Sequence, residues 1–385
     1  MTPFARIATA TAAVFTMALG AAPAASAQSD ILLQLRSGSP AGDRFRVDSA
    51  GGVVAIGRLG FGIIPASGAG VRLMWHPFKG AFRAGEASAS GEFDDANVGF
   101  YSWAGGSRTI ANAFASFSMG DQVEVTGTHA AGFGSSSQVR GTAAFSAGAS
   151  NRACGFASTT IGFTNTTGSL DAGGDCGTGS GQGAVALGYR STADADYAIA
   201  IGQRASANGR TGAIVLADAS TTDSLEASAN NQFSVRAAGG YRFFSNATET
   251  SGVTMAAGGG SFNTVSDRNR KELFEVLDGE EVLARIRAVP VTSWSYLSEG
   301  RATRHIGPMA QDWHAAFRLS SDSLTINSGD FDGVNLLGIQ ALERRTTAQA
   351  AQIAALGAEL AVKTERIETL EARIARLEAL LAPKP

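Results

Sequence analysis

Cysteine and histidine are scarce in this sequence, which has two cysteines and four histidines in 385 residues. The histidines are His76, His129, His305 and His314, and neither they nor the cysteines show the spacing of metal ligands. We therefore expect no metal and no other cofactor.

Excess charge of either sign is also small, with a net charge of -3 and a pI of about 5.9. Without a broad basic surface to neutralise phosphates, a nucleic-acid partner is not expected. Beyond the N-terminus there is no run of about 18 uncharged apolar residues, so we expect no membrane-spanning helix.

The N-terminus itself has the pattern of an export signal. Arg6 precedes an apolar run from Ile7 to Leu19, and small residues follow at Ala25 and Ala27. We predict that residues 1–27 are a signal peptide that is removed, and that the protein is exported to the cell surface or the extracellular space. In an exported chain, Cys154 and Cys176 are expected to form a disulfide within or between subunits; a pair of free buried thiols is the alternative.

Composition divides the chain near residues 257–265. Of the 48 glycines, 41 precede Ser266, whereas 32 of the 65 charged residues lie from Ser266 onward. We predict an N-terminal β shaft or head segment (28–99), β-roll repeats (100–220), a β connector (221–265), a small α+β domain (266–345) and a coiled coil (346–385).

Glycines mark an internal repeat in the second of these segments. They recur every 14 residues from Gly106 to Gly162 and, after a 12-residue step to Gly174, again at Gly188 and Gly202. Apolar and small residues alternate before each glycine, which predicts a short strand with one buried face and a turn that needs positive φ. A unit of two strands cannot bury a core alone, so the units are expected to stack.

The clearest part of the repeat, "AVALGYRSTADADYAIAIGQRASANGRTGAIVLAD" (184–218), resembles the head repeats of trimeric autotransporter adhesins. The resemblance implies parallel β-rolls that assemble three to a fibre. A flexible Gly/Ala/Ser linker is the alternative, but a linker would not keep an apolar register.

The segments that flank the repeats are less informative. "VRLMWHPFKGAFRAGE" (71–86) interleaves Trp75, Phe78 and Phe82 with basic residues. It could bind a glycan or a base, yet core packing is the commoner cause of such a pattern, and we assign no site there. Downstream, residues 232–244 are predicted to form two strands about a turn at Gly239 and Gly240.

Apolar residues near the C-terminus follow a heptad repeat. Position a holds Ile353, Leu360, Ile367, Ile374 and Leu381, and position d holds Leu356, Leu370 and Leu377, with the polar Lys363 between them. Arg366 and Arg373 at g can pair with Glu371 and Glu378 at e of a neighbour. This pattern predicts a parallel coiled coil, although its core does not by itself separate two strands from three.

Between repeat and coil, four landmarks occur in order. They are the Ser266–Asp267 start, Lys271 five residues after Ser266, the block "RHIGPMAQD" (304–312) and the helix "DGVNLLGIQAL" (332–342). Together they resemble the endosialidase-type intramolecular chaperone, the self-cleaving C-terminal domain of tailspikes and tail fibres. The resemblance covers about residues 266–345.

That family resemblance implies a domain that drives trimer assembly and then cuts itself off before the serine. Carried over, the cleaved bond is Val265–Ser266, Ser266 is the nucleophile and Lys271 is its base; Asp267, His305 and Gln311 are weaker supporting candidates. Arg270 departs from the family, which usually has an apolar residue there.

The local sequence offers a separate reason for the lysine's role. Asn269 and Glu272 form a capping-box pattern, which predicts a helix from Arg270 with Lys271 in its first turn. The helix dipole and the neighbouring Arg268 and Arg270 would then favour a neutral lysine, as a general base requires. The alternative is an ordinary loop with a solvated lysine.

Three functions are compatible with these features. The leading one is an exported homotrimeric fibre or adhesin-like surface protein that cleaves itself at Val265–Ser266 as a single-turnover Ser–Lys peptidase; such a fibre would bind a host-cell or surface glycan or protein. The second is the same trimer with its C-terminal domain retained. The last is a serine hydrolase acting on external substrates, against which the absence of a GxSxG motif and of a catalytic carboxylate pair counts.

Overall fold

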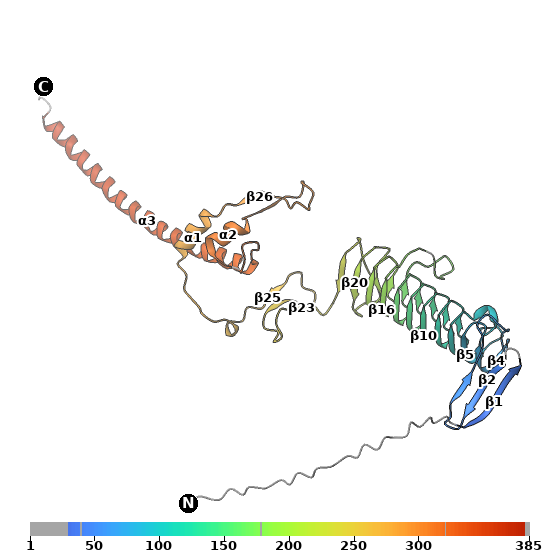
Figure 1. Cartoon of the computed structure of the whole chain (residues 1–385). Coiled ribbons are helices and arrows are strands. Elements are labelled where there is room, and N and C mark those ends of the chain that lie inside the picture. The colour runs from blue at the N-terminus through green and yellow to red at the C-terminus, as the bar shows by residue number, and fades with distance from the viewer. Residues whose placement is uncertain (1–29, 39–40, 178, 320, 382–385) are drawn as a thin grey trace, which may run out of the picture. The chain divides into compact units, whose positions relative to one another are not determined.

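The structure, a computed structural model, describes residues 30–381 except 39–40, 178 and 320. The predicted signal peptide lies outside the described residues. The chain forms two compact units, Met1–Gly239 and Gly240–Pro385 (Figure 1).

The first unit opens with antiparallel strands. β1 (Ile31–Gly38), β2 (Ala41–Asp48) and β3 (Val53–Ala55) form a three-stranded sheet. β4 (Gly70–His76) pairs with β5 (Ala81–Ala87) in antiparallel fashion. β5 also pairs in parallel with the first long strand of the roll, and a 3-10 turn, η1 (Asp95–Asn97), lies between these two strands in the chain. The roll therefore begins inside the segment 28–99 that was predicted to be separate.

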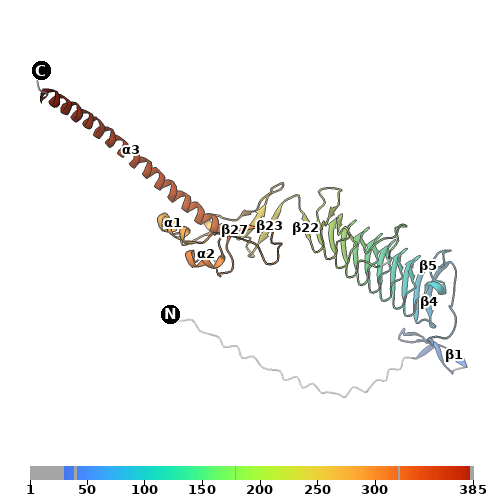
Figure 2. The same ribbon diagram turned by 90° about the horizontal axis from the view of Figure 1, so that it is seen from above.

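The roll consists of two sheets whose strands alternate along the chain (Figure 2). From β5 to β22 the longer strands stack in parallel to form, with β4, an 11-stranded sheet: β6 (Trp103–Ser107), β8 (Phe117–Asp121), β10 (Ala131–Ser135), β12 (Phe145–Ala149), β14 (Thr159–Phe163), β16 (Val185–Tyr189), β18 (Ile199–Gln203), β20 (Ile214–Ala217) and β22 (Phe233–Arg236). Two-residue strands form the 8-stranded sheet: β7 (Ile110–Ala111), β9 (Glu124–Val125), β11 (Gln138–Val139), β13 (Arg152–Ala153), β15 (Thr166–Thr167), β17 (Thr192–Ala193), β19 (Ala205–Ser206) and β21 (Leu225–Glu226).

This arrangement confirms the predicted parallel roll with two strands per coil. Its end differs from the prediction, because β21 and β22 extend the roll to Arg236, past residue 220. Residues 232–244 hold two strands on either side of a turn, as predicted, but these two strands do not pair with each other. β22 pairs with β20 in the roll, whereas β23 (Tyr241–Phe244) pairs with β24 (Gly252–Met255) in the second unit.

The recurring glycines are needed because neighbouring coils approach closely. Gly120 has a φ of 133°, and a Cβ there would lie 1.8 Å from the carbonyl oxygen of Gly134 in the next coil. No side chain fits such a gap, so glycine recurs at this position. Gly174 was wrongly placed in this register: it lies in a loop between β15 and β16, and the roll resumes at Gly188.

The interior of the roll is lined by small side chains. The second residue of these long strands is fully buried, as in Ser118, Ser146, Thr160, Ala186 and Ala200. The larger apolar neighbours point the other way and stay partly exposed, with Met119 at 39%, Phe133 at 37% and Ile161 at 43%. The buried face of each strand is thus the small-residue face, and the larger apolar residues form an outer face.

Aromatic rings continue this outer face along the sheet. Phe82, Trp103, Phe117, Phe133 and Phe145 contact one another in sequence, with ring centroids 5.2–5.9 Å apart. We name the row formed by these five residues and by Met119, Ile161, Leu187 and Ile201 the outer apolar row. In one chain its members range from half-buried to exposed. Large apolar patches on a protein surface generally mark an interaction site.

Two buried asparagines cross-link successive coils. Asn165 Nδ2 donates to the carbonyls of Ile161 and Gly188, each at 2.8 Å. Its Oδ1 accepts from the backbone N–H of Ser191 at 2.8 Å, and Asn151 repeats the pattern one coil earlier. These bonds satisfy polar groups that a thin interior leaves without water.

The second unit combines a small sheet with helices. β25 (Asn263–Thr264) completes the antiparallel sheet β23-β24-β25 and is followed by a 3-10 turn η2 (Arg268–Arg270). α1 (Gly279–Ala288), the β26 (Thr292–Trp294) and β27 (His305–Gly307) hairpin, α2 (Ala310–Phe317) and α3 (Ser328–Leu381) follow. Val282, Trp313 and Val334 bring α1, α2 and α3 together in one core.

The helix predictions for this unit have mixed outcomes. α1 is capped by Asp278, which accepts from the N–H of Glu280 at 2.9 Å, and it ends at Ala288, before Pro290. The helix predicted from Arg270 is wrong, since Lys271 is extended with φ −127° and ψ 151°. α3 runs unbroken through the predicted boundary at 345/346, and its heptad side chains are exposed, for example Leu370 at 46% and Ile353 at 69%.

Candidate active site

The bond before Ser266 is held at the end of a β-strand. β25 pairs with β24 through Val253 and Thr264, and the N–H of Val265 donates to the carbonyl of Gly252 at 3.1 Å. Hydrogen bonds to a neighbouring strand fix the backbone on the N-terminal side of the Val265–Ser266 bond. Nothing in the sequence near Ser266 points to Gly252, because pairing between distant segments leaves no local signal.

A 3-10 turn follows directly. Asp267 is its N-cap, and its Oδ1 accepts from the backbone N–H of Asn269 at 2.9 Å. The turn ends when the N–H of Lys271 donates to the carbonyl of Arg268 at 3.2 Å. The role of Asp267 is therefore to cap the turn between the two predicted catalytic residues.

This turn brings the ends of the two side chains together. Lys271 Nζ donates a hydrogen bond of 2.6 Å to Ser266 Oγ. An amine at this distance can accept the hydroxyl proton once it is neutral, which is the contact a Ser–Lys pair requires. Both residues are exposed, so the site is open to water.

Arg270, which departs from the resembled family, connects the turn to the small sheet. Its Nε lies 3.4 Å from Asp267 Oδ2, and one guanidinium nitrogen donates to the carbonyl of Glu249 at 3.5 Å. Glu249 lies in the β23–β24 turn and pairs with Arg242 at 2.6 Å. Arg270 contacts polar groups here, so an apolar residue is not required for the turn to form.

The two other candidates lie in a different part of the second unit. His305 Nε2 is 2.7 Å from Glu299 Oε2, and its ring stacks on Trp294 at 4.7 Å. Gln311 is in α2, in a hollow lined by Tyr296, Pro308 and Ile326. In the part of the chain that the structure describes, neither side chain contacts Ser266 or Lys271.

Part of the aromatic and basic segment 71–86 packs into the roll: Met74, His76 and Arg83 are buried, whereas Val71, Leu73 and Trp75 stay exposed. Arg83 is fully buried and donates to the carbonyls of Phe82 and Ala111, each at 2.7 Å. Burial lowers the pKa of its guanidinium to about 10, so it remains charged at neutral pH. Both of its terminal nitrogens donate to groups inside the protein, which favours core packing over ligand binding.

Within residues 30–381, as far as they are described, no group of three or more His, Cys, Asp or Glu side chains is placed to hold a metal ion. Over the same residues no helix combines the length and apolarity needed to cross a membrane. Cys154 and Cys176 are joined in a disulfide within one chain, with their Cα atoms 5.2 Å apart.

Comparison with known families agrees with this geometry. Residues 266–318 match the family Chaperone of endosialidase, and residues 180–205 match two copies of the YadA head domain repeat. No curated protein and no solved structure matched the chain. The predicted order, head repeats followed by a chaperone domain, is confirmed, and it supports a fibre- or adhesin-like chain.

Proposed function

We propose that the protein is an exported homotrimeric fibre or adhesin-like surface protein whose C-terminal domain aligns three chains and then cleaves itself at Val265–Ser266. The observation that carries the cleavage is the 2.6 Å hydrogen bond from Lys271 to Ser266, directly after a strand-bound valine. The match of residues 266–318 to the chaperone of endosialidase supports the assembly role.

Trimer formation is supported by two surfaces that a single chain leaves exposed. The outer apolar row covers the long-strand sheet of the roll, and the heptad residues of α3 remain 46–83% exposed from Ile353 to Leu381. Three copies that turn both surfaces inward would bury them. The resemblance of the roll to adhesin head repeats is the reason to choose three copies over two.

A helical tail can assemble before the roll does. Its contacts are local, whereas the strands of the roll pair over long sequence separations and lose more chain entropy on closing. A coiled coil that sets the register of three chains would therefore lower the entropic cost of forming the β part. Its removal after assembly would make the fibre kinetically stable.

The position of Ser266 determines the chemistry of cleavage. Because the serine follows the cleaved bond, its Oγ attacks the carbonyl carbon of Val265 through a five-membered ring. Neutral Lys271 takes the Oγ proton and returns a proton to the Ser266 nitrogen as the C–N bond breaks. This leaves an ester between Val265 and Ser266 Oγ, which water then hydrolyses to two chains.

The experiment is to purify the full chain and its Ser266→Ala variant, separate them on denaturing gels and sequence the N-terminus of any fragment. The proposal predicts a fragment that begins at Ser266 in the wild type and an intact chain in the variant. Hydroxylamine added during cleavage should yield a Val265 hydroxamate, which reports the ester. An intact wild-type chain that sediments as a trimer would instead favour a retained chaperone domain, and an intact monomer would refute both.

A further inference from the structure

An insertion interrupts the regular roll between β15 and β16. Residues 154–158 join β13 to β14, whereas residues 168–184 join β15 to β16 and include seven of the glycines. We name residues 168–184 the clasp loop. A loop so rich in glycine loses much conformational entropy when it is ordered, so specific contacts must offset that loss.

Residues 169–177 of the clasp loop form a small hairpin. Leu170 and Cys176 form an antiparallel bridge, and the N–H of Asp171 donates to the carbonyl of Asp175 at 2.8 Å. Asp171 Oδ1 accepts from the N–H groups of Gly173 and Asp175, each at 2.9 Å. These local bonds form the turn at residues 171–175 and fix the backbone positions of Asp175 and Cys176 at its end.

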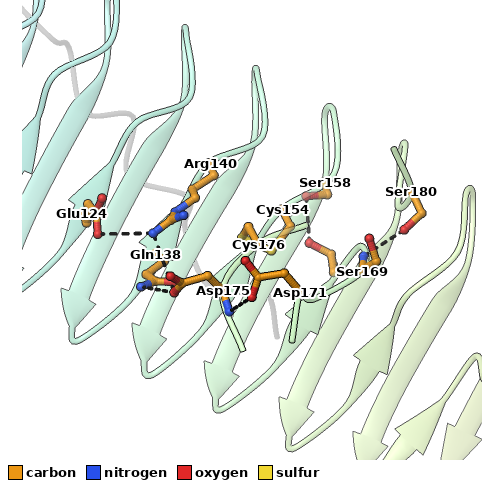
Figure 3. Close-up of a disulfide and its surroundings, with 11 residues drawn as sticks. Glu124, Gln138, Arg140, Cys154, Ser158, Ser169, Asp171, Asp175, Cys176 and Ser180 are labelled. Atoms are coloured by element: carbon orange, nitrogen blue, oxygen red, sulfur yellow. Dashed lines mark hydrogen bonds and ion pairs between the residues drawn. A yellow bond between two sulfur atoms is a disulfide. The ribbon is translucent and has the colours of Figure 1, made fainter. Parts of the chain in front are cut away.

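The hairpin lies back over two earlier coils (Figure 3). Cys176 is bonded to Cys154, which follows β13 in the preceding coil. Asp175 Oδ1 accepts from Gln138 Nε2 at 3.3 Å and lies 3.7 Å from Arg140, both from the coil before that. A guanidinium nitrogen of Arg140 also lies 3.9 Å from Glu124 Oε2, which belongs to the coil before that of Arg140.

The two cysteines meet because the coils are stacked. The parallel register of β13 and β15 pairs Ala153 with Thr167, so the clasp loop starts beside Cys154. Arg140 and Gln138 then hold Asp175, next to Cys176, over the same surface. In an unstacked chain the same thiols would meet only by random closure of a loop with a sequence separation of 22.

We propose that the clasp loop is a redox lock, which closes after the coils of β10 to β15 have stacked and then holds them together. Closure needs an oxidant, for which a small disulfide such as oxidised glutathione suffices. One cysteine thiolate attacks it and releases one glutathione, and the second cysteine then attacks the mixed disulfide and releases the other. Two electrons pass to glutathione, and two protons leave the thiols.

The test uses the full chain, reduced with dithiothreitol and then given oxidised glutathione. Remaining thiols are alkylated at intervals and counted by mass, in buffer and in a denaturant concentration that unfolds the roll. We expect closure at least tenfold faster in buffer. Arg140→Ala should slow closure several-fold in buffer, whereas Arg108→Ala, which removes a 3.0 Å ion pair with Asp121 elsewhere in the roll, should not.

Gln138→Leu gives a second variant that removes only one bond to Asp175, in case Arg140→Ala disturbs the roll. Circular dichroism of each reduced variant reports whether the roll remains folded. Equal rates in buffer and denaturant would overturn the proposal, because closure would then not depend on stacking. A folded Arg140→Ala or Gln138→Leu chain that closes as fast as Arg108→Ala would overturn it too.

Discussion

Lys271 Nζ and Ser266 Oγ are 2.6 Å apart although no α-helix connects the two residues. A single 3-10 turn, capped by Asp267, reverses the chain between them. The backbone of Lys271 itself is extended, so its side chain points back along the turn to the serine. The pair is therefore assembled locally, within six residues, and needs only the turn and the strand that precedes it.

The first prediction concerns Lys271 as the base of the pair. A general base must take up the proton of the Ser266 hydroxyl, and Lys271 Nζ is the group placed to do so. Lys271→Met removes the base and Lys271→Arg keeps a charge that cannot be lost, and both should stop cleavage. Quantitative gels of the three proteins measure this. Cleavage that continues in Lys271→Arg would contradict the role of lysine as base.

The second prediction concerns the cap of the turn. Asp267→Ala removes a capping bond worth about 1 kcal/mol, which should lower the population of the catalytic turn and slow cleavage about fivefold. Asp278→Ala is the matched control, since it removes an equivalent cap from α1, away from the serine. Single-turnover cleavage rates compare the two. Equal slowing in both variants would show a general loss of stability.

The sequence predicted this site for a partly wrong reason. Asn269 and Glu272 match a capping box, but Asp267 caps the chain two residues earlier and only a 3-10 turn forms. Leu273 then adopts a left-handed conformation with φ 57°, which ends any helix. The resemblance to the chaperone family suggested the pair, and the spacing alone would not have done so. The local competition between the two caps was not visible in the pattern.

For the roll, too, the sequence predicted some features and missed others. Glycine spacing predicted the coil length, because close approach of backbones leaves no alternative to glycine. The pattern did not show which face is buried in one chain, since Met119 and Phe133 would be placed inward by hydrophobicity alone. It also missed the insertion at Gly174, where glycine serves a loop, and the contact of Asp175 with Arg140 across coils.

The third prediction tests the close approach of coils. Gly120→Ala would place a Cβ 1.8 Å from the Gly134 carbonyl oxygen at a φ of 133°, so it should destabilise the roll by several kcal/mol. Gly105→Ala is the control, because its Cβ would be 3.5 Å from the nearest atoms and its φ is ordinary. Urea unfolding at equal protein concentration distinguishes them. Similar midpoints for the two variants would refute the steric argument.

The fourth prediction tests the buried asparagines. Asn165→Leu removes the two donated bonds of 2.8 Å and leaves the N–H of Ser191 without its acceptor inside the roll. An unsatisfied buried group costs about 1–3 kcal/mol, so the unfolding midpoint should fall clearly. Asn112→Leu changes an exposed asparagine of the same roll and should have little effect. If both variants unfold together with the wild type, the asparagine bonds do not stabilise the roll.

The last prediction concerns Lys363, the polar residue at position d of the heptad pattern. In one chain it forms an ion pair with Glu359 at 2.5 Å, and both side chains are exposed. If three tails associate, Lys363→Leu should strengthen the seam by up to about 2 kcal/mol per chain, because burial of a leucine outweighs a surface pair worth a few tenths. Thermal unfolding of the tail, followed by circular dichroism in the uncleaved Ser266→Ala background, measures the gain.

Lys384→Leu, beyond the last seam residue, is the control. A polar core residue also restricts register and partner number, so the Lys363→Leu trimer should sediment less uniformly than its parent; an unchanged melting temperature would mean that α3 does not associate through this seam.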